Sequence, residues 1–287
     1  MKKFFKRTIC LSLLSFCFFR AEQIKAVVPY YFFPSIKNLE KESLSIGKNA
    51  YQLLYFGQYK QSLNLAKLAV QLNRTNEKLW LILSEAQVAN KQYENALISL
   101  NKAQIINSKN SEIYFAKSNI YLKISELEKA KTSLEKGLRI RPNNHNAIFQ
   151  LGNIFLMEKN YSEAIKQFEK SVKIKPDFWP AINNQGLAYF EINNINQSIK
   201  MFKRAISIEE NPEPLLGLAS CLREEDINLA LQLAKEALTK NHNYVNYEYR
   251  KEQLWGAKLQ TETEILLKND QIQTDVKLAE SKINVFE

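Results

Sequence analysis

A pattern that returns every 34 residues constrains the fold of this chain more than any other feature of its sequence. The clearest copy is His145–Phe178. In it, Ile148, Gly152 and Phe155 lie at i, i+4 and i+7, which is the spacing of one face of a helix. A polar turn and a second run at helical spacing follow, and that run ends before Pro176, because proline cannot continue a helix. Each copy is therefore predicted to be a hairpin of two helices.

Two series of small residues place six copies in one register. The first series gives one small residue per copy, at Ala50, Ser84, Ser118, Gly152, Gly186 and Ser220. The second gives a pair seven residues apart in each second helix, at Ser62/Ala69, Ala96/Ala103, Ala130/Gly137, Ala164/Ser171, Ser198/Ala205 and Ala230/Ala237. A small residue permits the close approach of a neighbouring element. Together the two series indicate six consecutive hairpins.

This pattern resembles that of the tetratricopeptide repeat (TPR) family. The best copy has residues of the family's type at Ile148, Leu151, Gly152, Phe155, Ala164, Phe168, Ser171 and Pro176. The departures are local: Lys117 and Gln185 stand where the family has Leu, and the sixth copy is two residues shorter near Asp226. The resemblance implies an all-α fold, a right-handed TPR α-solenoid of about six helical hairpins with a C-terminal capping helix. It implies protein binding but no particular activity, since the family binds proteins of many kinds.

The chain divides into four parts. These are a signal peptide at 1–26, an N-terminal extended arm at 27–42, TPR repeats at 43–76, 77–110, 111–144, 145–178, 179–212 and 213–244, and a capping helix with a C-terminal tail at 245–287. The last apolar face of a solenoid must be covered by something polar outside. We expect one helix over Tyr247–Leu267 to cover it, with Trp255 against the sixth repeat, followed by a short final helix or a frayed end.

The first 26 residues have the features of a secretory leader. Four basic residues precede the apolar run Ile9–Phe19, and Ala26 closes an imperfect small-residue cleavage site. The run has 11 residues, which is too short to span a bilayer comfortably. We expect export with cleavage. The alternatives are retention as an uncleaved anchor and a cytoplasmic chain, and Arg20 is the residue that argues against export with cleavage.

The segment Ala26–Ser35, AVVPYYFFPS, is apolar and aromatic, and Pro29 and Pro34 break it too often for a helix. We expect it to cover an apolar face of the first repeat; contact with a partner or a membrane is the alternative. Its Val-Pro-Tyr-like sequence resembles that of exported TPR proteins from cyanobacteria and relatives in the chloroplast lumen. That resemblance implies the periplasm or the thylakoid lumen, and with it a role in the assembly of membrane or photosynthetic complexes.

Charge and composition argue against several functions. The leader holds six basic residues and one acidic residue, so its removal lowers the formal net charge from +10 to +5, and no nucleic acid is expected as a partner on charge alone. A helical-repeat RNA-binding protein is the alternative function. The two histidines, His145 and His242, lie far apart without metal-ligand spacing, and no phosphate-binding, nucleophile or zinc motif occurs. We therefore expect no enzyme, no catalytic residue, no metal and no cofactor.

In the TPR family the first helix of each repeat lines a concave surface, and the resemblance implies the inward positions of this chain. The predicted partner-binding residues are Phe115, Asn119, Asn146, Phe149, Gln150, Asn153, Asn183, Asn184, Leu187 and Phe190. Amides can donate to and accept from the backbone of a bound peptide, and aromatic side chains offer apolar anchors. The expected partner is an unidentified protein or peptide. The alternative is that an Asn-rich chain simply carries Asn over its whole surface.

Cations are absent from these inward positions in the central repeats, so a clamp for a C-terminal carboxylate is not expected. They lie instead on the second helices, as Lys166, Lys170 and Lys173 do in the fourth repeat. A solvated outer face accounts for them; peripheral contact with anionic lipid headgroups or an acidic partner is the alternative.

Overall fold

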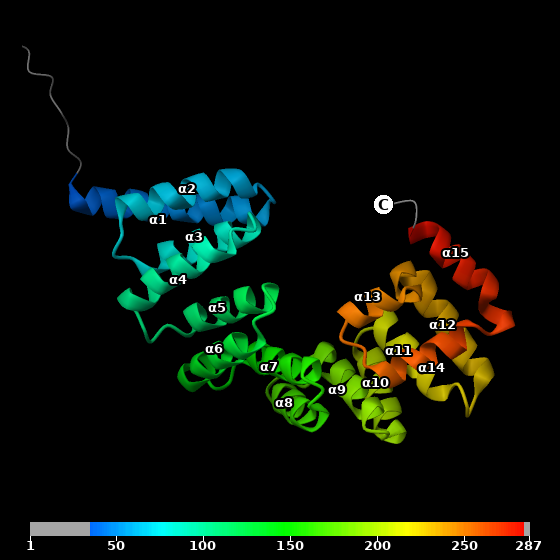
Figure 1. Ribbon diagram of the computed structural model, residues 1–287. Helices are drawn as coiled ribbons and strands as arrows, with labels where there is room; N and C mark the ends of the chain where they lie inside the picture. Colours follow the sequence, from blue (N-terminus) through cyan, green and yellow to red (C-terminus); the bar gives the residue numbers. More distant parts are fainter. Residues whose placement is uncertain (1–34, 284–287) are drawn as a thin grey trace, which may run out of the picture.

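The structure is a computed structural model that describes residues 35–283. The leader, residues 27–34 of the arm and residues 284–287 lie outside this range. Within it, twelve helices form six hairpins: α1 (Ile36–Tyr55) with α2 (Tyr59–Leu72), α3 (Glu77–Ala89) with α4 (Tyr93–Ile106), α5 (Ser111–Lys123) with α6 (Leu127–Ile140), α7 (His145–Met157) with α8 (Tyr161–Ile174), α9 (Trp179–Glu191) with α10 (Ile195–Ile208), and α11 (Pro212–Leu222) with α12 (Ile227–Lys240). The hairpins follow one another along a curved array, so the fold is an all-α solenoid (Figure 1).

The last described residues form a separate C-terminal segment that turns back onto the array (Figure 1). It consists of η1 (His242–Val245), α13 (Tyr247–Glu252), α14 (Ala257–Leu267), η2 (Asp270–Ile272) and α15 (Gln273–Ile283). Helix α14 packs on α9 and α11, and α15 packs on α12 and η1. Among residues 35–283, no helix has both the length and the apolar character needed to cross a membrane.

Asparagines begin many of the helices. Asn76, Asn110 and Asn144 precede α3, α5 and α7, and each side chain accepts a hydrogen bond from a backbone N–H of the first turn. Such caps satisfy N–H groups that have no partner inside the helix. The Asn-rich composition thus has a structural use at the repeat boundaries.

The turn inside each hairpin is equally regular. One residue with positive φ occurs in each of the first five hairpins, at Gly57, Lys91, Ser125, Lys159 and Asn193. These positions are 34 residues apart, so the left-handed turn repeats with the sequence period. The shortened sixth copy has no positive φ in its turn, which is consistent with the two residues it lacks.

The predicted small positions lie where the two helices of a hairpin touch. A Cβ atom at Gly152 would lie 2.4 Å from the ring of Phe168, and one at Gly186 would lie 2.7 Å from the ring of Phe202. Both rings are fully buried. The register deduced from the small residues is therefore confirmed, because only a residue without a side chain leaves room for these rings.

The predicted arm is shorter than expected. Helix α1 begins at Ile36, and Ser35 caps it by accepting a hydrogen bond from the Asn38 N–H at 3.2 Å. Residues 36–42, predicted to be extended, are therefore helical, because Ser35 supplies a helix start immediately after Pro34. The remainder of the arm lies outside the described residues.

The free end of the first hairpin is polar. In the fourth repeat, Leu151 and Ile154 of α7 are buried in one cluster with residues of α6. The matching positions of α1 are Asn49 and Gln52, and both are exposed. This face of α1 is therefore polar at these two positions, and the expectation that the arm covers an apolar face of the first repeat stays a prediction.

The predicted helix over Tyr247–Leu267 is broken in two. Leu254 has φ +67°, and the carboxylate of Glu191 from α9 lies where a Cβ atom on Gly256 would be. Glu191 Oε1 accepts from the Leu259 N–H at 3.0 Å, so a residue of the fifth repeat caps α14. The expectation for Trp255 is confirmed: its side chain is buried in one core cluster with residues of α11 and α12.

Candidate binding cleft on the inner side of the array

A cavity of about 280 Å³ lies on the inner side of the array, where the first helices of the fourth to sixth repeats meet the C-terminal segment. Its lining combines aromatic, amide and acidic side chains: Phe149, Asn153, Trp179, Pro180, Asn184, Glu213, Glu252, Gln253 and Leu254. Helix α7 supplies Phe149 and Asn153, and the first half of α9 supplies the next three side chains of this list. Glu213 comes from α11, and the end of α13 with the break that follows it supplies the last three.

Three predicted site residues, Phe149, Asn153 and Asn184, come together in this cleft. Asn184 Nδ2 donates to Asn153 Oδ1 at 2.9 Å, and Asn183 Nδ2 donates to Asn184 Oδ1 at 3.1 Å. The amides of neighbouring repeats therefore form a chain. Phe149 packs edge-on against Phe178, with ring centroids 5.2 Å apart, which fixes one wall of the cleft.

The prediction of an open groove wall is wrong for most of the fifth repeat. Asn184 is 7% exposed, although it still lines the cleft. Asn183, Leu187 and Phe190 are buried, and the last two share a core cluster with Trp255 and Leu259 of the C-terminal segment. The physical reason is that this segment folds back over α9. These side chains stabilise the closure and are not accessible to a partner in this conformation.

The prediction is also wrong for Phe115. This ring is buried in the core of the third repeat, and a Cβ atom at Gly137 would lie 2.4 Å from it. Glycine at that position of α6 leaves a space that the phenylalanine fills. Asn119 and Asn146 are exposed, and Gln150 is half-buried, so a role for these three in binding stays a prediction.

Six residues of the cleft lining were not among the predicted site residues, and Glu213 is the one of them that is buried. It is buried in the first turn of α11, and burial raises its pKa to about 7, although hydrogen bonds from Trp255, Asn183 and Tyr244 favour its charged form. The indole N–H of Trp255 donates to Glu213 Oε1 at 3.1 Å. An acidic residue in the first turn of a helix is ordinary. No local signal in the sequence could have shown that the C-terminal segment buries it.

The cleft suits recognition of a polypeptide better than covalent chemistry. It offers aromatic surface, amides that can pair with a backbone, and the carboxylates of Glu213 and Glu252, and its lining holds no Lys or Arg. Within residues 35–283, no three His, Cys, Asp or Glu side chains gather as a metal site would require. The thiol of Cys221 is buried, and burial raises its pKa to about 12, which makes it a poor nucleophile.

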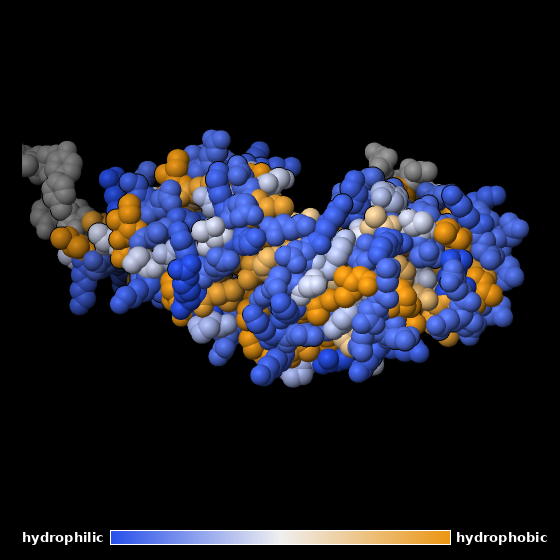
Figure 2. All heavy atoms as spheres, turned by 60° about the horizontal axis from the view of Figure 1, so that its bottom comes forward, coloured by the Kyte–Doolittle hydropathy of each residue, from blue (hydrophilic) through white to orange (hydrophobic). Residues whose placement is uncertain are grey.

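The outer face has a different character. Figure 2 shows the side that points downward in Figure 1, with hydrophilic residues over most of it and apolar residues between them. The predicted cations Lys166, Lys170 and Lys173 are exposed on α8. Lys166 pairs with Glu163 of the same helix at 2.5 Å, an exposed pair of the kind that contributes little to stability.

Family models described as tetratricopeptide repeats match residues 111–144, 145–178 and 180–212. No curated protein is detectably similar in sequence. Solved structures with a similar fold include a crystal structure of MamA protein, at 22% identity and TM-score 0.53 over 61% of this chain and 93% of that chain. They also include YrrB, described as a TPR protein with an unusual peptide-binding site, at 19% identity and TM-score 0.50 over 70% of this chain and 98% of that chain. PilF of Pseudomonas aeruginosa is 15% identical, with TM-score 0.63 over 76% of this chain and 98% of that chain. At these identities the likeness concerns the fold.

Proposed function

Because the chain is a tetratricopeptide repeat protein, we propose that it is a non-catalytic scaffold that holds a polypeptide partner in the cleft between the fourth repeat and the C-terminal segment. The observation that carries the proposal is the lining of this cleft, which joins the Asn153–Asn184 amide pair to an aromatic wall. Amide pairs can exchange hydrogen bonds with a peptide backbone, and aromatic walls hold apolar anchors.

The charge of the cleft limits the kind of peptide that it can bind. Glu252, and Glu213 above its raised pKa of about 7, place negative charge in the lining without a cation, so the cleft favours a peptide that is neutral or basic at this point. A C-terminal carboxylate would meet these two carboxylates unfavourably. The peptide-binding site named for the neighbour YrrB gives general support, since it shows that the fold can hold peptides.

The inner side of the first repeat supplies a second, apolar region. Leu44, Tyr51 and Tyr55 of α1 are 49%, 56% and 85% exposed and follow one another along one helix face. A partner that extends beyond the cleft toward the N-terminal repeats would bury these side chains. Burial of apolar area at about 25 cal/mol per Å² would add affinity there.

Site-specific photo-crosslinking tests the proposal and identifies the partner in the same experiment. A photoreactive phenylalanine replaces Phe149 in the cleft or, as the matched control, Lys203 on α10 of the outer face. The proposal expects a polypeptide adduct from the first position and none from the second, with the adduct then identified by mass spectrometry. Adducts from Lys203 alone would move the binding surface to the outer face.

Affinity measurements with the identified partner complete the test. Asn153→Ala should weaken binding by about 0.5–1.5 kcal/mol, the value of one hydrogen bond. Asn196→Ala, at an exposed position of α10, is the control and should bind as the unchanged chain does. Equal affinities for all three proteins would contradict a contact through the amide pair.

We also propose that this scaffold is exported to the periplasm or the thylakoid lumen and serves the assembly of a membrane or photosynthetic complex. Support comes from the leader-like residues 1–26 and from the segment Ala26–Ser35, both of them sequence features. Mass spectrometry of the protein from its native cells tests the location. A mature N-terminus near Val27 is expected, whereas a chain that retains Met1 would contradict cleavage.

A further inference from the structure

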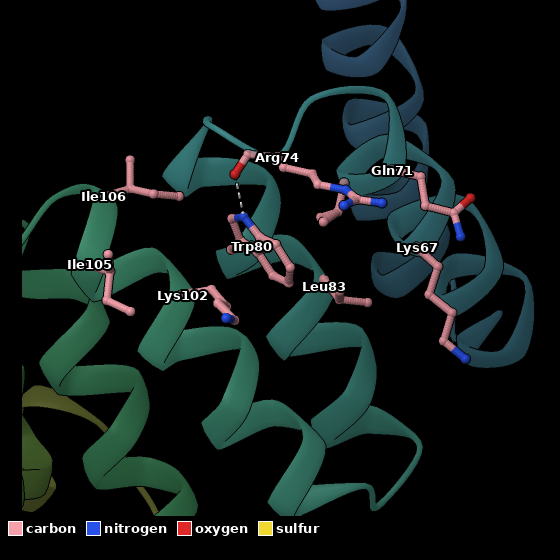
Figure 3. Close-up of a pocket in the computed structure, with 9 residues that line it drawn as sticks. Lys67, Gln71, Arg74, Trp80, Leu83, Lys102, Ile105 and Ile106 are labelled. Atoms are coloured by element: carbon pink, nitrogen blue, oxygen red, sulfur yellow. Dashed lines mark hydrogen bonds between the residues drawn. The ribbon is translucent and has the colours of Figure 1, made fainter.

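A second cavity, of about 540 Å³, opens between the first and second repeats (Figure 3). Helices α2 and α4 form its walls, and α3 forms its floor. Its lining is mostly apolar with three cations: Lys67, Val70, Gln71, Arg74, Trp80, Leu83, Lys102, Ile105 and Ile106. We call it the α2/α4 crevice. It lies between second helices, so it belongs to the opposite side of the array from the cleft described above.

The floor of the α2/α4 crevice is a fixed aromatic surface. The indole N–H of Trp80 donates to the backbone carbonyl of Arg74 at 2.9 Å, which holds the ring in place (Figure 3). Ile105 stands at the edge of the crevice and is 79% exposed. The positions that match Ile105 in the next two repeats hold Arg139 and Lys173. Of these three repeats, only the second therefore has an apolar residue at this position. A rigid aromatic side chain in an apolar hollow is typical of binding pockets.

The matching place one repeat later holds a hydrogen-bonded lysine, Lys117, which we call the plug together with its two acceptors. Between α4 and α6, the amine of Lys117 donates to Asn101 Oδ1 at 2.6 Å and also to Gln104 Oε1. Burial there lowers the pKa of Lys117. Both acceptors belong to α4, so the plug lies against that helix.

The α2/α4 crevice lacks all three groups of this plug. One repeat earlier, the positions of Lys117, Asn101 and Gln104 are taken by Leu83, Lys67 and Val70. The side chains of Leu83 and Val70 form no hydrogen bonds, so the bonds of the plug cannot form in the α2/α4 crevice.

Charge distinguishes the α2/α4 crevice as well. Lys67 and Arg74 lie on the α2 side, Lys102 lies on the α4 side, and the lining contains no carboxylate. Among the described residues, none of these three cations takes part in an ion pair. An anion placed on either wall would meet positive charge without displacing an internal partner.

We propose that the α2/α4 crevice binds an acidic peptide segment of a partner protein, with one large apolar side chain over Trp80 and a carboxylate on each side of it. The arrangement of charge favours a peptide as the ligand. The cations on both walls would pair with two acidic residues of the peptide, and the apolar floor between them would hold the apolar side chain that lies between those residues. A lipid would present its charge at one end of the apolar chain only. This site goes beyond the function proposed above, since it lies on the other side of the array and prefers the opposite charge.

Peptide display on the full mature chain tests the proposal. A random 12-residue library is selected on the unchanged protein and counter-selected on a variant in which the native plug is transplanted, Lys67→Asn with Val70→Gln and Leu83→Lys. This variant has a precedent in the neighbouring crevice, so it should fold. Enriched peptides are expected to carry an aromatic or aliphatic residue with Asp or Glu on both sides. No enrichment over the plugged variant, or enrichment without acidic residues, would overturn the proposal.

Binding of one enriched peptide, measured by fluorescence anisotropy, then locates the site. Lys67→Glu with Lys102→Glu should weaken binding at least tenfold, and so should the plugged variant. Lys200→Glu with Lys203→Glu on α10 changes the net charge equally and should stay within twofold. Phe149→Ala in the inner cleft should also stay within twofold, which separates this site from the function proposed above.

Vesicles of phosphatidylglycerol and phosphatidylcholine provide the competing outcome. If the unchanged protein binds these vesicles and the plugged variant does not, the crevice is a lipid site and the peptide proposal is overturned. Equal behaviour of the two proteins toward vesicles, together with the peptide results above, would support it.

Discussion

The indole N–H of Trp255 donates to the carboxylate of Glu213 over 3.1 Å and thereby ties the C-terminal segment to the sixth repeat. Both side chains are buried, so the bond forms only when the segment has folded back onto α11. Glu191 makes a second such contact when it caps α14. The inner side of the last two repeats is consequently closed, and the cleft lies at the margin of the closed region.

The first prediction concerns Glu213 and pH. Burial raises its pKa from 4.5 to about 7, so the folded chain holds a proton that the unfolded chain has released between these values. The stability that this proton supplies is full below about pH 4.5 and is lost as pH rises through 7. Glu213→Gln keeps an acceptor for Trp255 but cannot titrate. Between pH 4.5 and 8, the variant should therefore gain about 3 kcal/mol relative to the unchanged chain, at about 1.4 kcal/mol for each pH unit.

Urea unfolding at several pH values checks this prediction. Glu224→Gln is the control, because the Glu224 side chain is 81% exposed and its change should have no comparable effect. Parallel stability curves for the Glu213→Gln variant and the unchanged chain would show that Glu213 titrates normally.

The second prediction concerns the buried Arg250. Its guanidinium donates to Gln260 Oε1 at 2.8 Å, to the Tyr244 and Val245 carbonyls at 2.7 and 2.9 Å, and to Glu264. Arg250→Met leaves these acceptors, the buried Gln260 among them, without their donor and should cost about 3–5 kcal/mol of stability. Calorimetry measures the loss. Arg139→Met on the exposed face of α6 is the control and should stay within about 0.5 kcal/mol.

The third prediction concerns the contact between the two helices of a hairpin. Gly152→Ala places a Cβ atom 2.4 Å from the ring of Phe168, so the ring or the helix must move. Overpacking of this kind costs about 1–3 kcal/mol. A lower melting temperature is expected, whereas Asn146→Ala at an exposed position of the same helix should leave it nearly unchanged. An unchanged melting temperature for Gly152→Ala would contradict the close approach.

Local pattern was sufficient to predict the hairpins. The series through Gly152 and Gly186 reports contacts between residues about 16 positions apart, and the same contact occurs in the fourth and the fifth repeat, so one sequence shows it more than once. The repeated left-handed turn has a similar basis, although Lys91 and Ser125 carry no sequence signal for it. Repetition made these features visible.

The candidate site could be predicted only in part. Phe149 and Asn153 were found because the inward positions follow the repeat. Other features of the site depend on contacts between residues 42 to 68 positions apart, and each of these contacts occurs once in the chain. These features are the burial of Leu187 and Phe190, the break at Leu254 and the role of Glu213. A contact that occurs only once leaves no periodic signal in the sequence.

The last prediction concerns the C-terminal segment as a whole. A chain that ends at Asn243 loses Trp255, Leu259 and Leu266, which share a core cluster with Leu187 and Leu218 of the array. Each buried side chain of this size contributes about 1.5–3 kcal/mol, and the partners left behind would form an exposed apolar patch. We expect the truncated chain to aggregate, as measured by light scattering, and to bind a hydrophobic dye before it does so. A chain that ends at Ser281 keeps these contacts and is the control. A truncated chain at Asn243 that stays monomeric and fully helical would show that the array needs no cover at this end.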